Sequence, residues 1–223
     1  MRIIFAVLRV AVAIAIIAAI VAQLSTSIGF WTAKGGVDVP MHVWHFFSFF
    51  TIDSNILAAA VMLIGAYFLV RRSGPDPSWF NLLRASAVTY MAVTGIVYNL
   101  LLRGIELPQG STVPWSNEVL HVVACVWLVL DWFYAPGRSP IAAEKLWKVL
   151  VFPIVWVGYT LVRGPLVADT VYGNPFWYPY PFLNPETSAE GYFTVAFYVL
   201  LIAVAIGSTA AGVLWISRRM RAT

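Results

Sequence analysis

The chain has 223 residues, of which 61% are hydrophobic and 11% are charged, and its mean hydropathy is +0.81. A soluble domain carries about a quarter charged residues, so this composition excludes an ordinary soluble enzyme and indicates a polytopic membrane protein with one domain over residues 1–223. The single cysteine, Cys125, excludes an intrachain disulfide and a cysteine-rich metal site. The formal net charge is +4, but no basic run with interleaved aromatic residues indicates a nucleic-acid partner.

Six apolar stretches are each long enough to cross roughly 30 Å of hydrocarbon as a helix. In chain order they span Val10–Phe30, Trp44–Val70, Leu82–Leu102, Asn117–Tyr134, Leu146–Val162 and Tyr192–Ile216. Segments rich in Pro, Gly and Ser separate several of them, at 73–77, 108–114, 136–140 and 164–185. We therefore predict an all-α bundle of six transmembrane helices.

The basic residues indicate how the helices cross the membrane, because Lys and Arg accumulate in cytoplasmic loops. Eleven of the fourteen lie on one side of the predicted bundle: Arg2, Arg9, Arg71, Arg72, Arg84, Arg138, Lys145, Lys148, Arg218, Arg219 and Arg221. The other three are Lys34, Arg103 and Arg163. This asymmetry and the even number of spans predict that both termini lie in the cytoplasm.

A small polar set interrupts two of the apolar stretches. Thr51, Asp53 and Asn55 lie in FFTIDSNIL, and His121 lies in NEVLHVVACVWLVLDW. Polar groups are costly inside a bilayer, so their presence there indicates a function. A hydroxyl and an imidazole on facing helices can act as nucleophile and general base, which makes Thr51 and His121 the candidate catalytic pair. The alternative is that both make only structural hydrogen bonds.

Further polar residues lie at the ends of two other stretches. Asn99 and Arg103 end the third, and Tyr159 and Arg163 end the fifth. All fall in the outer half of the predicted bundle, whereas the inner halves are nearly pure Ala, Val, Leu and Ile. This pattern predicts a cavity that opens outward or toward lipid, because a continuous pore needs polar residues along its length. The loop at 163–191 contains FWYPYPFLNP and is predicted to form a rigid lid at the membrane interface.

Asp53 is the polar residue that packing alone explains least well, because a carboxylate within a membrane needs a partner or a proton. If the second helix starts near His42, Thr51 lies about 13 Å and Asp53 about 16 Å from its outer end, which puts Asp53 near the midplane. Asp53 points roughly 200° away from Thr51 around the helix, so direct contact is not expected. Three roles are open for Asp53: it orients His121, it pairs with Arg103 or Arg163, or it is protonated and makes a structural hydrogen bond.

Other ionisable residues in the apolar stretches have simpler explanations. His42 and His45 lie near the outer end of the second stretch and are expected to be interfacial. Asp131 is expected to be an interfacial anchor at the inner end of its helix. The chain has three histidines and no HxxxH or CxxC spacing, so neither a metal nor a haem cofactor is expected.

Four segments together resemble a family of six-helix membrane proteins: FFTIDSNIL, NEVLHVVACVWLVLDW, YTLVRG and WYPYPFLNP. The family includes the vertebrate androgen-induced membrane proteins, which hydrolyse fatty acid esters of hydroxy fatty acids, and the last two segments are most similar to its bacterial branch. The resemblance implies a threonine nucleophile at Thr51 and a catalytic histidine at His121. It also implies a fatty-acyl ester substrate and a location in the bacterial cytoplasmic membrane.

We therefore expect an intramembrane hydrolase of lipid carboxylic esters, supported by Asp53, Asn55, Asn99, Arg103, Tyr159 and Arg163 in substrate binding or orientation. Asn55, Asn99 and Arg163 are the candidate donors to the oxyanion. The alternative is a non-enzymatic lipid-binding or lipid-transport protein, in which Arg103 and Arg163 pair with an anionic headgroup. A quinone or haem redox protein is a third class, and it predicts a visible absorption band.

Overall fold

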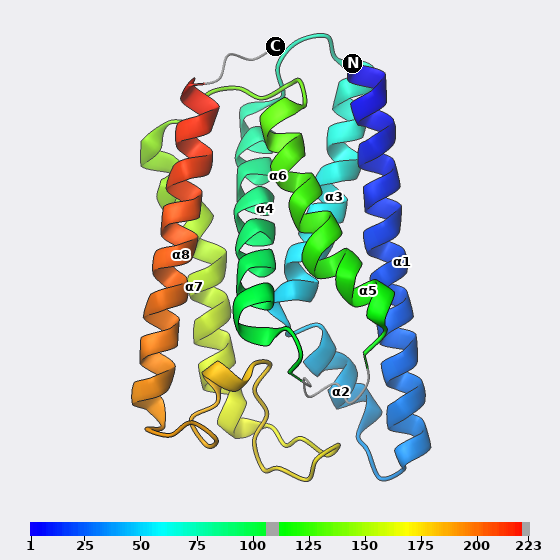
Figure 1. Cartoon of the computed structure of the whole chain (residues 1–223), viewed down its shortest axis with the longest axis vertical. Coiled ribbons are helices and arrows are strands. Elements are labelled where there is room, and N and C mark those ends of the chain that lie inside the picture. The colour runs from blue at the N-terminus through cyan, green and yellow to red at the C-terminus, as the bar shows by residue number, and fades with distance from the viewer. Residues whose placement is uncertain (106–111, 220–223) are drawn as a thin grey trace.

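The computed structural model describes residues 1–105 and 112–219, and it is all-α (Figure 1). Within these residues, six helical segments are long and apolar enough to cross a membrane: Arg2–Lys34, Phe50–Arg71, Ser78–Leu102, Pro114–Tyr134, Ala143–Leu166 and Tyr192–Arg219. The predicted all-helical architecture, with six helices able to cross a membrane, is therefore confirmed. Pro108, in a predicted loop, and Arg221, in the C-terminal basic cluster, lie outside the described residues.

The chain forms eight α-helices in the described residues: α1 (Arg2–Lys34), α2 (Val39–Phe46), α3 (Phe50–Arg71), α4 (Ser78–Val97), α5 (Pro114–Glu118), α6 (Ala124–Tyr134), α7 (Leu146–Arg163) and α8 (Tyr192–Arg219). Two π-helical turns extend them. Tyr98–Leu102 continues α4, and Val119–Val123 joins α5 to α6. Short 3₁₀ turns form at Ala143–Lys145, Gly164–Leu166 and Pro181–Leu183.

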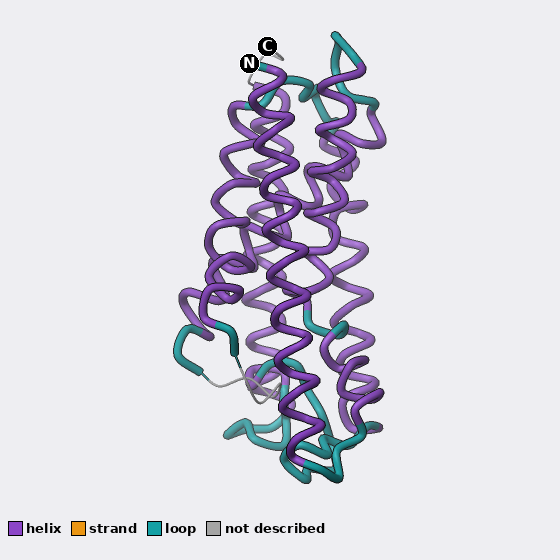
Figure 2. The backbone as a smooth tube through the Cα atoms, turned by 90° about the vertical axis from the view of Figure 1, so that its right-hand side faces the viewer, coloured by secondary structure: helices purple, strands orange, loops and turns teal. Residues whose placement is uncertain are grey.

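The helices run roughly parallel to one long axis, and the loops gather at its two ends (Figures 1 and 2). α1 packs along α3, while α4 lies at the centre and contacts α3, α6 and α8. The start of α1 and the end of α8 lie at the same end, which we call the terminal end; α2 and the loop at 164–191 lie at the other, the loop end. The exterior carries many exposed apolar side chains, as expected of a surface that faces lipid: Ile14, Val21, Val155, Leu200 and Val204.

The second predicted span is wrong at its outer end. The structure divides it into α2, which ends at Phe46, and α3, which begins at Phe50. Ser48 lies in the break, where its carbonyl accepts a hydrogen bond from Trp156 Nε1 at 3.1 Å. Thr51 therefore lies in the first turn of α3, and Asp53 is about 4.5 Å from the start of that helix, not about 16 Å. The hydropathy pattern conceals the break because the residues around it are apolar and aromatic.

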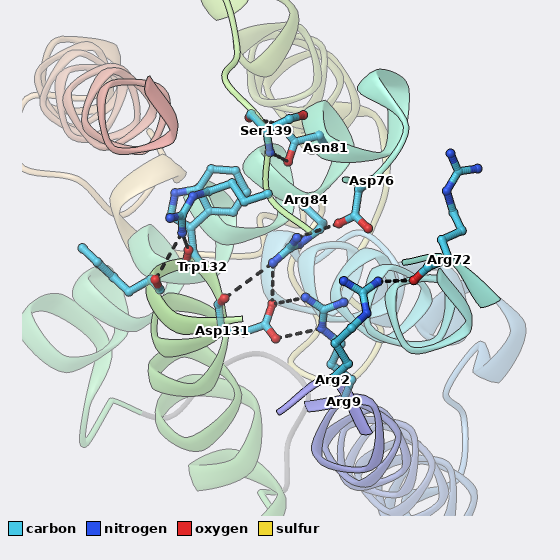
Figure 3. A network of polar contacts seen from close by, with 11 residues as sticks. Arg2, Arg9, Arg72, Asp76, Asn81, Arg84, Asp131, Trp132 and Ser139 are labelled. Atoms are coloured by element: carbon cyan, nitrogen blue, oxygen red, sulfur yellow. Dashed lines mark hydrogen bonds and ion pairs between the residues drawn. The ribbon is translucent and has the colours of Figure 1, made fainter. Parts of the chain in front are cut away.

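The terminal half of the bundle contains a buried ionic network, which contradicts the prediction that it is nearly purely apolar (Figure 3). Arg9 donates through Nε and Nη2 to the two carboxylate oxygens of Asp131, at 2.8 and 3.0 Å. Arg84 bridges Asp131 and Asp76, at 3.0 and 2.8 Å. Asp131 is completely buried, so it is not an interfacial anchor, and Arg9 and Arg84 are helix-pairing residues rather than loop charges. A buried charge is tolerated when it is paired and hydrogen-bonded, as these are.

Gly65 makes room for this network on α3. A Cβ atom at this position would lie 2.6 Å from Arg9 Nη1 and 3.2 Å from a ring carbon of Phe80. Arg9 is held by two bonds to Asp131, so it cannot move aside without weakening the ion pair. The close packing of α1 against α3 therefore requires glycine here.

Candidate functional site

Thr51 is positioned by the start of α3. The first backbone N–H groups of a helix have no partner within it. The N–H of Thr51 is one of these, and it donates to the phenolic oxygen of Tyr180 at 3.2 Å. Thr51 is 7% exposed, and its Oγ1 lies between two polar groups, the imidazole of His121 and the hydroxyl of Tyr180.

His121 comes from the π-helical turn Val119–Val123 on the facing segment. Its Nε2 lies 3.3 Å from Thr51 Oγ1. A π-turn widens the helix locally and redirects its side chains and carbonyls, and such turns recur at functional sites. Here the carbonyl of Leu120 accepts a hydrogen bond from Asn55 Nδ2 at 3.1 Å, which ties the turn to α3. The structure thus brings together the two residues that the sequence singled out.

The hydrogen bonds of His121 define its tautomer. Nδ1 lies 2.9 Å from the backbone carbonyl of Asn117, which can only accept, so Nδ1 carries the proton. In the neutral imidazole, Nε2 is then the acceptor and faces the Thr51 hydroxyl. Thr51 Oγ1 therefore donates to Nε2, which is the arrangement that a general base and a hydroxyl nucleophile require.

Tyr98 and Arg103 support the His121 ring on one of its faces. The ring of Tyr98 stacks on the imidazole with a centroid separation of 4.0 Å. The guanidinium of Arg103 lies over the Tyr98 ring, 5.1 Å from its centroid. Arg103 also forms a two-bond ion pair with Glu118. The Tyr98 hydroxyl also contacts Asn117 Nδ2. Arg103 therefore supports the histidine through Tyr98 and does not face Thr51.

Tyr180 is the site residue that reasoning from the sequence missed. It lies in the loop at 164–191, and its hydroxyl is 3.2 Å from both Thr51 Oγ1 and Thr51 N. Burial raises the pKa of Tyr180 to about 12, so the phenol is neutral at physiological pH and can donate to Thr51 Oγ1. The only signal was the FWYPYPFLNP composition, which indicated a lid without indicating which ring contacts Thr51.

None of the three predicted oxyanion donors contacts Thr51 Oγ1, whose hydrogen-bonding neighbours are His121 and Tyr180. Asn55 uses both Nδ2 hydrogens, donating to the carbonyls of Thr51 and Leu120 at 2.9 and 3.1 Å. Asn99 is exposed and donates to the carbonyl of Gly95. The guanidinium of Arg163 contacts Met41 Sδ and three aromatic rings. Asn55 is thus a bridge between helices, and the donors nearest to Thr51 Oγ1 are its own N–H and Tyr180.

Asp53 and Tyr159 lie on a different face of the bundle from the Thr51–His121 pair. Asp53 lines a groove between α2, α3 and α7, and within the described residues it makes no hydrogen bond or ion pair with His121, Arg103 or Arg163. Tyr159 lines the same groove and binds Trp44 and Ser48 through its hydroxyl at 2.8 and 2.9 Å. Of the three roles considered for Asp53, neither orientation of His121 nor pairing with Arg103 or Arg163 is therefore seen.

An apolar cavity of about 170 Å³ opens beside Thr51. It lies between α4, α7 and α8, and its wall includes Val97, Ile154 and Ile206. Thr51 and Tyr180 form its polar end, and the exposed side chain of Ile154 shows that it reaches the lipid-facing surface. A cavity of this lining suits hydrocarbon better than water.

His42 and His45 lie in α2 at the loop end, as expected, but they are not exposed there: both are fully buried beneath the loop at 164–191. His45 stacks on Trp177 with a centroid separation of 4.1 Å, and His42 contacts Thr170 Oγ1 at 3.0 Å. Burial lowers the pKa of His45 to about 3, and nearby Arg163 lowers it further in the same direction, so the ring is neutral at physiological pH. In the described residues, no three His, Cys, Asp or Glu side chains gather as metal ligands do.

The resemblance to the androgen-induced membrane proteins rests on four short segments and the helix count, and it stays a prediction. Comparison of the chain with protein-family models, with curated proteins and with solved structures finds no match in any of the three.

Proposed function

We propose that this protein is an intramembrane hydrolase of lipid carboxylic esters, with Thr51 as nucleophile and His121 as general base. The observation that carries the proposal is the 3.3 Å approach of His121 Nε2 to Thr51 Oγ1, with Nδ1 protonated against the Asn117 carbonyl. This geometry agrees with the roles that the family resemblance implies. It gives a weakly acidic hydroxyl the base that it needs for attack.

The reaction follows from this arrangement in two steps. Thr51 Oγ1 attacks the ester carbonyl carbon as its proton passes to His121 Nε2, and a tetrahedral oxyanion forms. The imidazolium returns the proton to the leaving alkoxide, so an alcohol departs and an acyl-threonine ester remains. Water then attacks this ester, giving its proton to His121, and the acid is released as Thr51 regains a hydrogen.

The oxyanion would be held by Tyr180 and by the N–H of Thr51. In the resting site these two groups bond to each other at 3.2 Å, and the carbonyl oxygen of a substrate would take the place of that contact. Both donors are neutral and buried, so little solvent competes for them. The positive end of the α3 dipole adds to the same effect.

The apolar cavity accounts for a fatty-acyl substrate. An acyl chain entering between the helices would lie along Val97, Ile154 and Ile206, with its carbonyl carbon at the Thr51 end. Because the chain would enter from lipid, which is as apolar as the cavity wall, its binding would depend on packing against these side chains rather than on removal from water. Fatty acid esters of hydroxy fatty acids fit this requirement.

The same proposal includes an orientation in the membrane. We place the terminal end in the cytoplasm and the loop end outside, in a bacterial cytoplasmic membrane. Basic residues gather at the loops and helix ends of the terminal end, as cytoplasmic segments require: Arg2, Arg71, Arg72, Lys145, Lys148 and Arg218. The Thr51–His121 pair would then lie near the outer surface, within reach of water.

The test is covalent labelling of the detergent-purified protein with a fluorophosphonate, followed by peptide mass spectrometry. We expect an adduct on Thr51 that is retained in Thr51→Ser and lost in both Thr51→Ala and His121→Ala. Thr94→Ala is the matched control, because Thr94 is also a buried threonine that lines the apolar cavity. An adduct that persists in Thr51→Ala, or its absence from a folded wild type, contradicts the mechanism.

A lipid-binding protein without catalysis is the second candidate, and one observation favours it. A groove of about 690 Å³ runs between α2, α3 and α7, and two of its lining residues, Trp44 and Tyr159, carry the Arg163 guanidinium over their rings. No carboxylate of the described residues pairs with Arg163. This candidate predicts that native mass spectrometry finds a retained anionic phospholipid, which Arg163→Gln releases and Thr51→Ala does not.

A further inference from the structure

A second cavity lies within the loop at the loop end of the bundle. Its volume is about 180 Å³, similar to that of the apolar cavity, but its lining has a different chemistry. Carboxylate, amide and hydroxyl groups contribute to its wall from Asp169, Asn174, Asn184 and Thr187. We call it the loop cavity.

Tyr180 is the one residue of the described chain that lines both cavities. Its ring is buried and stacks on Phe182, with centroids 5.2 Å apart and planes within 7°. Its hydroxyl contacts Thr51, whose side chain faces the apolar cavity. A single aromatic ring therefore separates a polar space from an apolar one at the position of the proposed nucleophile.

The side chains that line the two cavities favour water in the loop cavity and hydrocarbon in the apolar cavity. A cavity of roughly 150 Å³ lined by aliphatic and aromatic side chains stays dry, whereas a buried water needs two to four polar partners and only about 10–15 Å³ of space for its centre. The loop cavity meets both conditions for water. The apolar cavity has the space, but its wall is almost entirely hydrocarbon and offers few polar partners. Of these two cavities, the loop cavity on the Tyr180 side is therefore the one suited to supply Thr51 with water.

We infer that the loop cavity is the water subsite of the enzyme and that the Tyr180 ring is the partition through which water reaches Thr51. The inference rests on the proposed hydrolase function, because hydrolysis of an acyl-threonine ester consumes one water. That water would add its oxygen to the acyl carbon and its proton to His121 Nε2 as the bond to Thr51 Oγ1 breaks. Displacement of the ring would join the two cavities and release the N–H of Thr51 from Tyr180.

The test measures access to position 51 without requiring any hydrolysis. Thr51→Cys is made in a Cys125→Ala background, and its reaction with a small cationic methanethiosulfonate is followed by mass spectrometry. We expect slow labelling when Tyr180 is present and also in Tyr180→Phe, which keeps the ring. Tyr180→Ala, or Tyr180→Leu if the alanine variant does not fold, is expected to accelerate labelling several-fold.

A blocking substitution identifies the route. Thr187 is an exposed residue of the loop-cavity wall, so Thr187→Trp added to the accelerated variant should return labelling to the slow rate. Glu186→Trp is the matched control, since Glu186 is the exposed neighbour and does not line the cavity. An uncharged apolar thiol reagent, which can enter from the lipid side, should react equally with and without Thr187→Trp.

The inference is overturned if removal of the ring leaves the cationic labelling rate unchanged, or if Thr187→Trp and Glu186→Trp act alike. These outcomes are separate from the failure of the hydrolase proposal. If a folded protein gives no fluorophosphonate adduct but its position 51 is labelled as expected, the loop cavity leads to Thr51 and the hydrolase proposal fails. A protein that gives the adduct but fails the access test hydrolyses esters with water from another direction.

Discussion

His121 Nε2 lies 3.3 Å from Thr51 Oγ1, and a backbone carbonyl rather than a carboxylate orients the other ring nitrogen. In a Ser-His-Asp triad, a buried carboxylate fixes the tautomer and stabilises the imidazolium. Here the Asn117 carbonyl can fix the tautomer, but it carries less negative charge than a carboxylate and so stabilises the imidazolium less. No carboxylate of a described residue hydrogen-bonds to His121, so the proposed catalytic unit is a dyad.

Tyr180→Phe tests the role of the phenol in this dyad. The substitution removes one neutral donor near the position of the oxyanion and leaves the ring packing against Phe182. We expect kcat for ester hydrolysis to fall by about 10²–10³, as for the loss of one oxyanion donor, with little change in KM. Steady-state kinetics on a fatty-acyl ester in detergent provide the measurement. An unchanged kcat would assign Tyr180 to the partition alone.

Asp131→Asn tests the buried ionic network at the terminal end. The amide has the shape of the carboxylate but leaves the guanidinium groups of Arg9 and Arg84 without their shared counter-charge. Removal of one partner from a buried ion pair costs about 3–5 kcal/mol, so we expect a large loss in the free energy of unfolding. Thermal unfolding in detergent measures it. Glu118→Gln, at the exposed pair with Arg103, should change stability little, and equal losses in the two variants would refute the assignment.

Gly65→Ala tests the close approach of α1 and α3. The added methyl group would meet Arg9 Nη1 at 2.6 Å, and overpacking of this kind costs about 1–3 kcal/mol. Gly207→Ala on α8 is the matched control, because nothing lies within 4 Å of its Cβ position. We expect a lower melting temperature for Gly65→Ala only. Similar melting temperatures for the two variants would mean that Arg9 moves aside without loss.

The buried histidine His45 predicts how stability depends on pH. In the unfolded chain its pKa is about 6.5, whereas in the folded protein burial lowers it to about 3. The unfolded state therefore binds the proton first, so stability that is fully present above about pH 6.5 is lost progressively as the pH falls toward 3. We expect the melting temperature to drop between pH 7 and pH 4.5, and to drop less in His45→Phe, which retains a ring against Trp177. Parallel curves would show that His45 does not titrate on unfolding.

Some of the site was predictable because membrane helices make polar residues conspicuous. Thr51 and His121 are a hydroxyl and an imidazole in apolar segments, where each needs a reason to be present. Asp53 stood out for the same reason, yet it faces the groove between α2, α3 and α7. The free-energy cost of burying a polar group in the bilayer identifies candidate residues, but it does not say which neighbour each residue contacts.

The all-helical class of the protein and its six candidate spans could be predicted without any structure. Both follow from local hydropathy, a property that each segment carries independently of the others. The break between α2 and α3 escaped this reasoning because its residues are as apolar as the helices beside it.

Which side chains meet depends on the packing of distant segments. Thr51 and Tyr180 are 129 positions apart in the chain, and Arg9 and Asp131 are 122 apart, so neither contact has a local signature. Such distances depend on how the helices rotate and pack against one another, which the polar residues of a single segment do not specify. The role of each polar residue was therefore decided by its neighbours in the folded bundle.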